Sequence, residues 1–254
     1  SAYAAPDRGK GGAIWIQQNS APALTNCTFL LNKGRHGGAI FIEESSPVIT
    51  NCWFEGNHVI AGFHLGGEHV NGADDDIGGG AIYALDSSPQ IVDCWFKANY
   101  TRWLGGNIPV VGIGGAVRND NSNTTMSNCL FEYCTAREGG ALFNTNGSSV
   151  VLNTCTFNSN EGEHHGGAVY NEGASTEVTM NGCIFSLNSV NDNSDTFWGG
   201  AMYFWNSTNI LNGCSFAGNR AAQGAGIFMQ GGTSILADCM FTANLALHGD
   251  QDYS

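Results

Sequence analysis

Positively charged side chains are scarce in this chain of 254 residues, which has 9 Lys and Arg against 22 Asp and Glu and a formal net charge of −13. Because a field of this sign repels phosphates on average, we expect no nucleic acid, polyphosphate or anionic membrane as a partner. The chain also lacks any run of about 18 apolar residues and any basic start followed by apolar and small residues. We therefore expect neither a membrane-spanning helix nor an intact signal peptide.

Charged residues make up only 12% of the chain and prolines number 5, whereas glycines number 36 and apolar residues reach 42%. This mixture is too apolar for a disordered chain and too rich in glycine for an ordinary helical domain. Helices are therefore not expected to dominate, and internal repeats are the first pattern to look for.

Two short motifs alternate along the chain. The first, Gly-Gly-Ala-aliphatic-aromatic, begins at Gly11, Gly37, Gly79, Gly114, Gly139, Gly166 and Gly199, with a degraded copy at Gly224. The second, Cys-x-Phe-x-x-Asn, begins at Cys27, Cys52, Cys94, Cys129, Cys155, Cys183, Cys214 and Cys239. The spacing between them is nearly constant: 16 positions separate Gly11 from Cys27, and 15 separate Gly37 from Cys52.

Each repeat holds three short apolar stretches, separated by turn residues such as Ser45-Ser46-Pro47. Stretches this short are not amphipathic helices. Stacking equivalent strands about 4.8 Å apart satisfies their backbone groups and buries one apolar stripe per strand. The sequence thus predicts an all-β fold, a right-handed parallel β-helix of about eight to nine turns, as a single domain over residues 1–254. Interrupted repeat units at Gly11 and at 248–250 lead us to expect a segment of a longer protein.

The cysteines and asparagines follow the same register. Eight of the nine cysteines occupy one equivalent position, and the ninth, Cys134, stands where other repeats have asparagine. Stacked side chains with parallel Cβ vectors are poorly placed for disulfides, so we expect mostly reduced, buried thiols. The recurrent asparagine predicts a ladder of amide side chains inside the coil.

One connection varies in length. From the asparagine to the next Gly-Gly the gap is 5 at Asn32, but 22 at Asn57, 15 at Asn99 and 11 at Asn188. The three inserted loops, about His58–Gly78, Tyr100–Ile113 and Ser189–Trp198, therefore leave the same corner. In repeat proteins such a corner often forms the binding face.

The motif residue after each aliphatic forms the candidate ligand-binding column. It comprises Trp15, Phe41, Tyr83, Arg118, Phe143, Tyr170, Tyr203 and Phe228. If the preceding aliphatic residues point inward, strand alternation turns this column outward, and the charged Arg118 favours that phase. An outward stripe of rings suits stacking on sugars, and Trp103 and Trp198 of the inserted loops are added to the surface. Two alternatives stay open: the reverse phase, with the rings in the core, and loops that fold over the stripe.

Metal-binding and catalytic groups are less sharply indicated. His58, His64, His69 and residues 74–76, three aspartates, gather on the longest loop. They could hold Ca²⁺ or a transition metal, but their irregular spacing favours a solvated acidic loop, and we expect no cofactor.

General acid–base pairs could be drawn from groups near the variable corner, namely His36, His165, His248, Arg35, Arg137, Glu138 and Glu163. For a lyase the nearest set is Arg118 with Asp120 and a bound Ca²⁺. For a glycosidase the candidates are Glu138, Glu161, Glu163, Asp192 and Asp195, and no spacing selects a pair.

Gly-Gly-Ala-Ile followed by Phe-x-x-Asn, repeated through nearly the whole chain, resembles the repeats of the chlamydial polymorphic outer membrane proteins. More broadly, the chain resembles the pectate-lyase-like β-helix superfamily. The first resemblance implies surface-exposed adhesins, and the second implies, in part, enzymes that cleave polysaccharides.

Three functions remain open. We expect first a secreted or cell-surface module, adhesin-like and not an enzyme, that binds a glycan or a protein through the outward stripe and the neighbouring loops. The second is a polysaccharide lyase or glycoside hydrolase with its cleft between the loops. The third is a structural fibre or spacer unit that associates end to end through exposed strand edges.

Overall fold

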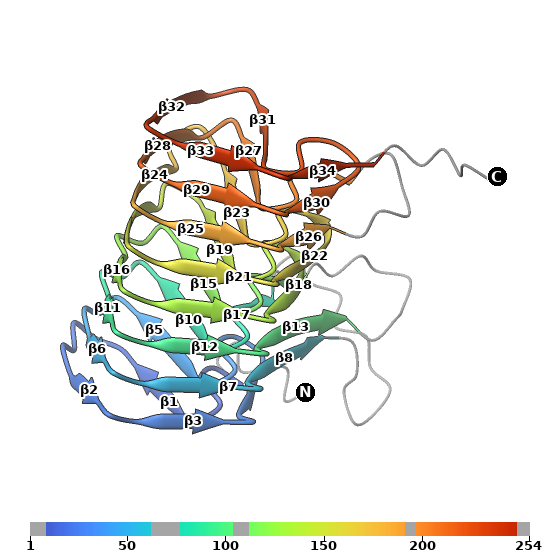
Figure 1. Cartoon of the computed structure of the whole chain (residues 1–254). Helices are drawn as coiled ribbons and strands as arrows, with labels where there is room; N and C mark the ends of the chain where they lie inside the picture. Colours follow the sequence, from blue (N-terminus) through green and yellow to red (C-terminus); the bar gives the residue numbers. More distant parts are fainter. Residues whose placement is uncertain (1–8, 62–76, 104–111, 191–196, 248–254) are drawn as a thin grey trace, which may run out of the picture.

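The computed structural model describes residues 9–61, 77–103, 112–190 and 197–247. Strands, turns and bends make up this part of the chain, which contains no helix able to cross a membrane. The strands wind into eight stacked turns of a right-handed parallel β-helix, with the first turn at one end of the stack and the last at the other (Figure 1). The predicted fold class is confirmed.

Every turn contributes one strand to each of four parallel sheets. The first sheet is β1 (Ile14–Ile16), β5 (Ile40–Glu43), β10 (Ile82–Leu85), β15 (Val117–Asp120), β19 (Leu142–Thr145), β23 (Val169–Glu172), β27 (Met202–Trp205) and β31 (Ile227–Gln230). The second is β2 (Ala23–Thr25), β6 (Val48–Thr50), β11 (Gln90–Val92), β16 (Thr125–Ser127), β20 (Ser149–Asn153), β24 (Glu177–Asn181), β28 (Thr208–Asn212) and β32 (Thr233–Ala237).

The third sheet faces the reader in Figure 1. It is β3 (Thr28–Leu30), β7 (Trp53–Glu55), β12 (Trp95–Lys97), β17 (Leu130–Glu132), β21 (Thr156–Asn158), β25 (Ile184–Ser186), β29 (Ser215–Ala217) and β33 (Met240–Thr242).

The fourth sheet is an element that the sequence interpretation, with three stretches per repeat, did not include. It is β4 (Lys33–Gly34), β8 (His58–Ala61), β13 (Tyr100–Trp103), β18 (Thr135–Glu138), β22 (Glu161–His165), β26 (Ser189–Val190), β30 (Arg220–Ala221) and β34 (Leu245–Ala246), joined by β9 (Ile77–Gly78) and β14 (Gly112–Ile113). Its buried positions hold Val59, Thr101, Ala136 and Gly162, which share no apolar signature.

The inner core is built from columns of like residues. Aliphatic side chains of the first two sheets, such as Ile40, Ile82, Ile49 and Ile91, are fully buried. From the third sheet comes a column of eight phenylalanines, from Phe29 to Phe241, whose neighbouring ring centroids lie 4.7 to 5.0 Å apart. This spacing equals the distance between adjacent strands, so the ring stack follows directly from the register.

The cysteines are all free, seven of them buried and Cys27 and Cys239 half-buried, as the register predicts. Each buried thiol donates a hydrogen bond to nearby backbone carbonyls, as Cys94 does to Val92 O at 3.2 Å. The cysteine column therefore acts as small, apolar core material.

The predicted amide ladder is also present. Asn57 Nδ2 donates to Asn99 Oδ1 at 3.0 Å and to Phe29 O at 2.8 Å, and the pattern recurs from Asn160 to Asn244. A second buried ladder, which the sequence analysis missed, links Asn119, Asn144, Asn171 and Asn209 on the first and second sheets.

The paired glycines permit the turn that leads into the first sheet. Gly79 has a φ of +66°, and a Cβ added to Gly80 would overlap the carbonyl of Gly115 and approach Tyr100 N within 2.8 Å. The first glycine thus supplies a left-handed conformation and the second a close backbone approach.

Candidate functional site

The column from Trp15 to Phe228 lies on the outer face of the first sheet, as strand alternation predicts. Its rings do not belong to the inner core; Phe143, Tyr170 and Tyr203 form a separate cluster with Ile113. The expectation that these rings face solvent is wrong, however. Phe41, Tyr83, Arg118, Phe143, Tyr170 and Tyr203 are each exposed by 6% or less. Trp15, at 38%, is the one exposed ring of the column, and Phe228 is half-buried.

A second column, formed by the residue before each Gly-Gly pair, packs over these rings. Parallel bridges connect Lys10 to His36 and His165 to Trp198, and β14 pairs with β18 between them. The ring centroid of His36 lies 5.5 Å from that of Tyr83, and the ring of His165 lies 4.8 Å from that of Tyr203. We call the two columns together the outer cluster.

The structure describes the side chain of only one of the two loop tryptophans that were predicted to extend the binding surface. Trp198 is half-buried in the outer cluster, with its ring 4.9 Å from that of Phe228. Trp103 ends β13, where its backbone pairs with Ala61, and its side chain lies outside the described part of the chain.

Arg118 and Asp120, the candidate lyase pair, do come together. Arg118 donates from Nη2 to Asp120 Oδ2 at 2.8 Å, and its guanidinium lies 4.6 Å from the centre of the Tyr83 ring. Asp120 also accepts from Tyr83 Oη at 3.0 Å and from Asn146 Nδ2 at 2.7 Å. Arg118 and Asp120 are exposed by only 3% and 7%, so the pair serves as a buried link between turns and not as an open catalytic site.

The outer cluster holds its histidines in the neutral form. Burial, reinforced by the positive charges of Arg35, Arg118 and Lys10, lowers the pKa of His36 from 6.5 to about 4. Burial, with smaller effects from His164 and Arg137, also lowers the pKa of His165 to about 4. His36 Nδ1 is buried without a hydrogen-bond partner, which adds to the cost of charging this ring.

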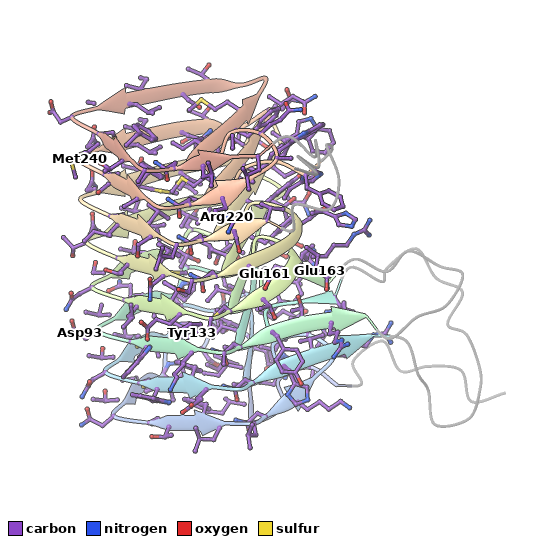
Figure 2. The ribbon with its side chains drawn as sticks, turned by 45° about the vertical axis from the view of Figure 1, so that its right-hand side comes forward. Asp93, Tyr133, Glu161, Glu163, Arg220 and Met240 are labelled. Atoms are coloured by element: carbon purple, nitrogen blue, oxygen red, sulfur yellow. The ribbon has the colours of Figure 1, made fainter. Side chains whose placement is uncertain are left out.

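The metal candidates are not assembled in the described residues, whereas two acid–base candidates, Glu138 of β18 and His165 of β22, are partners in the strand register. Within residues 9–61, 77–103, 112–190 and 197–247, no three His, Cys, Asp or Glu side chains are grouped to hold a metal ion. His58 stacks on Tyr100 with ring centroids 4.8 Å apart. Glu161 and Glu163 are exposed on β22, and Figure 2 shows them on the fourth sheet below Arg220.

Six other candidates or ranges of this kind fall outside the described residues. They are His64, His69, residues 74–76, Asp192, Asp195 and His248.

A pair of partly solvent-accessible tryptophans lies on the outer face of the third sheet. Trp53 of β7 pairs in register with Trp95 of β12, their ring centroids 3.9 Å apart and their planes tilted by 59°. Both rings are half-buried, so part of each indole reaches solvent. We call Trp53, Trp95 and the side chains of Glu55, Lys97 and Glu132 the tryptophan platform.

Charged groups fix the two indoles of the platform. Trp53 Nε1 donates to Glu55 Oε2 at 2.9 Å, and Trp95 Nε1 donates to Glu132 Oε2 at 3.1 Å. Lys97 Nζ lies 3.4 Å from Glu55 Oε1 and 5.9 Å from the centre of the Trp95 ring. The rings are thus held in place before any ligand arrives, which reduces the entropy that binding would cost.

A line of polar side chains extends the platform along the stacked turns. Glu132 Oε1 accepts from Asn158 Nδ2 at 3.3 Å, and Asn158 Oδ1 accepts from Ser186 Oγ at 3.0 Å. These residues belong to β17, β21 and β25, which are neighbours in the third sheet. Tyr133, 54% exposed, lies beside this line where the third sheet turns towards the fourth (Figure 2).

The tryptophan platform was not predicted, although the sequence carries a signal for it. Trp53 and Trp95 occupy the variable position of Cys-x-Phe, between two residues that both point into the coil. With the cysteines and phenylalanines inside, that position faces outward, since successive side chains of a bent strand segment cannot all enter the core.

Stacked turns of parallel strands around a closed apolar core define the class of the protein, a parallel β-helix solenoid. Residues 68–236, more than half of the chain, match the family model described as a right handed beta helix region, and the chain belongs to that family. No curated protein and no solved structure gives a significant match. The family defines a fold that hosts many functions, so a function must be argued from the residues of the site.

Proposed function

We propose that this β-helix is a secreted or cell-surface module that binds a glycan on the tryptophan platform, without cleaving it. The observation that carries the proposal is the pairing of Trp53 and Trp95, two partly exposed indoles held against each other on an outer sheet face. The resemblance of the repeats to those of surface adhesins supports the proposed location and role.

The chemistry of the platform suits a sugar. Indole faces stack on the C–H faces of a pyranose ring, and they are large contact surfaces with little side-chain entropy to lose. The carboxylates of Glu55 and Glu132 accept hydrogen bonds from hydroxyl groups, and Lys97 donates them. A small number of fixed polar groups around an apolar contact is typical of a specific ligand site.

The outer cluster supports this function less well than the platform does. Most of its rings are buried, and a polymer would have to displace the residues packed on them before touching Phe143 or Tyr170. The lyase alternative depends on Arg118 and Asp120, which are buried in the same cluster and already bonded to each other.

A glycan array tests the proposal. We expect the full chain to bind at least one glycan on the array. Trp53→Ala and Trp95→Ala should each weaken the affinity for that glycan by about tenfold or more, because each removes a central aromatic contact. Trp205→Ala is the matched control, because Trp205 is 40% exposed but lies on the first sheet. Its affinity should equal that of the unchanged chain.

Two outcomes would overturn the proposal. The first is the absence of any bound glycan, or binding that is indifferent to both platform variants. The second is turnover: reducing-sugar and unsaturated-product assays of the bound glycans, with and without Ca²⁺, should give no product, and product formation would identify an enzyme. Light scattering in the same buffer reports end-to-end association, the remaining alternative.

A further inference from the structure

Resting on the proposed function, we infer the class and direction of the ligand: a linear, uncharged polysaccharide that lies along the axis of the solenoid, from the tryptophan platform to Ser186. Three features of the third sheet carry this inference. They are the charge of the platform, the direction of its polar line and the shortness of its strands.

The charge of the platform selects an uncharged sugar. Glu55 and Glu132 flank the two indoles, and the one cation of the platform, Lys97, already lies 3.4 Å from Glu55. A uronate or sulfated unit stacked on Trp95 would bring a third negative group to this site in a chain of net charge −13. Because carboxylates accept hydrogen bonds but do not donate them, hydroxyl groups are the partners that they favour.

The polar line fixes the direction. Glu55, Lys97, Glu132, Asn158 and Ser186 occupy equivalent positions of five successive turns, as the strand register shows. Adjacent strands lie about 4.8 Å apart, so the line is about 19 Å long. One pyranose unit is about as long as one strand spacing, and each turn therefore offers a polar group to one sugar unit.

The end of the line is chemically suited to hydroxyl groups. Asn158 carries a side-chain donor and acceptor, and Ser186 carries a hydroxyl that does both. Both side chains are partly exposed, and each is oriented by a hydrogen bond along the line, at 3.3 Å to Glu132 and 3.0 Å between the two. Neither is charged, so the line becomes less acidic away from the indoles and continues to suit a neutral chain.

A ligand that crosses the strands would find less to bind. The strands of this sheet, such as β7 and β12, are three residues long, which gives a path of about 10 Å. Beyond β12 the chain turns a corner into the fourth sheet, so a straight polymer would leave the surface there. The axial path is the longer one on this face.

Charge is tested first. Soluble β-glucan, mannan and xylan are compared with polygalacturonate and alginate in affinity electrophoresis of the full chain. We expect retardation by at least one neutral polymer and none by the uronates. If a uronate polymer retards the chain and the Trp53→Ala substitution abolishes this retardation, the inference is overturned but the proposed function stands. If no polymer retards the chain, the proposed function itself is contradicted.

Direction is tested by ligand length. With the oligomers of the retained neutral polymer, calorimetry should show affinity rising from disaccharide to tetrasaccharide. Asn158→Ala and Ser186→Ala should each lower the affinity for the tetrasaccharide about threefold to tenfold and leave the affinity for the disaccharide unchanged. Trp53→Ala should lower both affinities. Asn212→Ala, an exposed amide on the second sheet, is the matched control and should change neither.

An axial ligand would be excluded by either of two results. Affinity that does not depend on oligomer length means that the site accepts only one or two units. Full affinity for the longer oligomer in both Asn158→Ala and Ser186→Ala means that the chain runs elsewhere on the surface.

Discussion

At the scale of single residues, Cys134 illustrates how a column accepts a substitute. It stands between Asn99 and Asn160, and its thiol donates to Phe96 O at 3.5 Å, the bond that an asparagine amide makes elsewhere in the column. Its backbone N–H still donates to Asn160 Oδ1 at 3.0 Å. The thiol reproduces the position of the amide but supplies weaker hydrogen bonds.

Cys134→Asn should therefore stabilise the protein. The new amide would donate to Phe96 O and Asn160 Oδ1 and restore an uninterrupted ladder, a gain of about 1 kcal/mol in the free energy of unfolding. Urea denaturation followed by circular dichroism measures it. Asn188→Cys, the reverse change in the same column, should destabilise by a similar amount or more; a destabilised Cys134→Asn would contradict this view of the column.

At the scale of elements, strand alternation predicted correctly which side chains leave the coil, but not whether they remain exposed. Ile40 and Phe41 show the limit: the first enters the inner core and the second leaves it, yet both are buried. The residues that cover the rings share a position in the repeat but no residue type, so no sequence motif predicts them. They include His36, Ile113, His165 and Trp198.

The fourth sheet and the tryptophan platform escaped prediction for related reasons. Strands β8 and β13 precede the loops of variable length, and the inward positions of the fourth sheet share no residue type. The platform depends on two tryptophans in a column whose other members include Leu130, Thr156 and Ser215, so it has no period. Repeats predict the average turn well, and sites lie where single turns depart from it.

The outer cluster should make stability depend on pH. His36 has a pKa of about 4 when folded and an ordinary value near 6.5 when unfolded, so between these values the unfolded chain binds more protons. The contribution of neutral His36 to the free energy of unfolding is fully present above pH 6.5, and it is lost as the pH falls towards 4. The loss should be roughly 2 to 3 kcal/mol for His36, and smaller for the more exposed His165.

His36→Phe separates this effect from the titration of carboxylates. A phenyl ring keeps the contacts with Phe41 and Tyr83 but binds no proton, so the difference in melting temperature between pH 7 and pH 4.5 should shrink relative to the unchanged chain. Equal pH profiles for the two proteins would mean that His36 is not held neutral.

At the scale of the whole molecule, the solenoid is held together without covalent cross-links. All nine cysteines are free; eight of them stack in one column with parallel side-chain directions, and Cys134 lies in the asparagine column. Stability must therefore come from the contacts between neighbouring turns, each buried against the next.

Thiol labelling checks this view of the molecule. In the native state iodoacetamide should react slowly and only at Cys27 and Cys239, because the other seven thiols are buried. In denaturant without reductant, mass spectrometry should find nine labelled cysteines per chain. Fewer than nine would reveal a disulfide that the stacked arrangement forbids.

The corner that carries the insertions has a consequence for how this protein can change. Cys27 and Cys52, in consecutive turns, are 25 residues apart, whereas Cys52 and Cys94, also in consecutive turns, are 42 apart, yet both pairs stack in the same way. Because closure entropy grows only with the logarithm of length, the longer excursion costs about 0.5 kcal/mol more. New segments can accordingly be added, exchanged or lengthened between β8 and β9 or between β13 and β14 at little cost in free energy. Evolution or engineering can therefore change the sequence and length of the chain most easily at this edge of the scaffold.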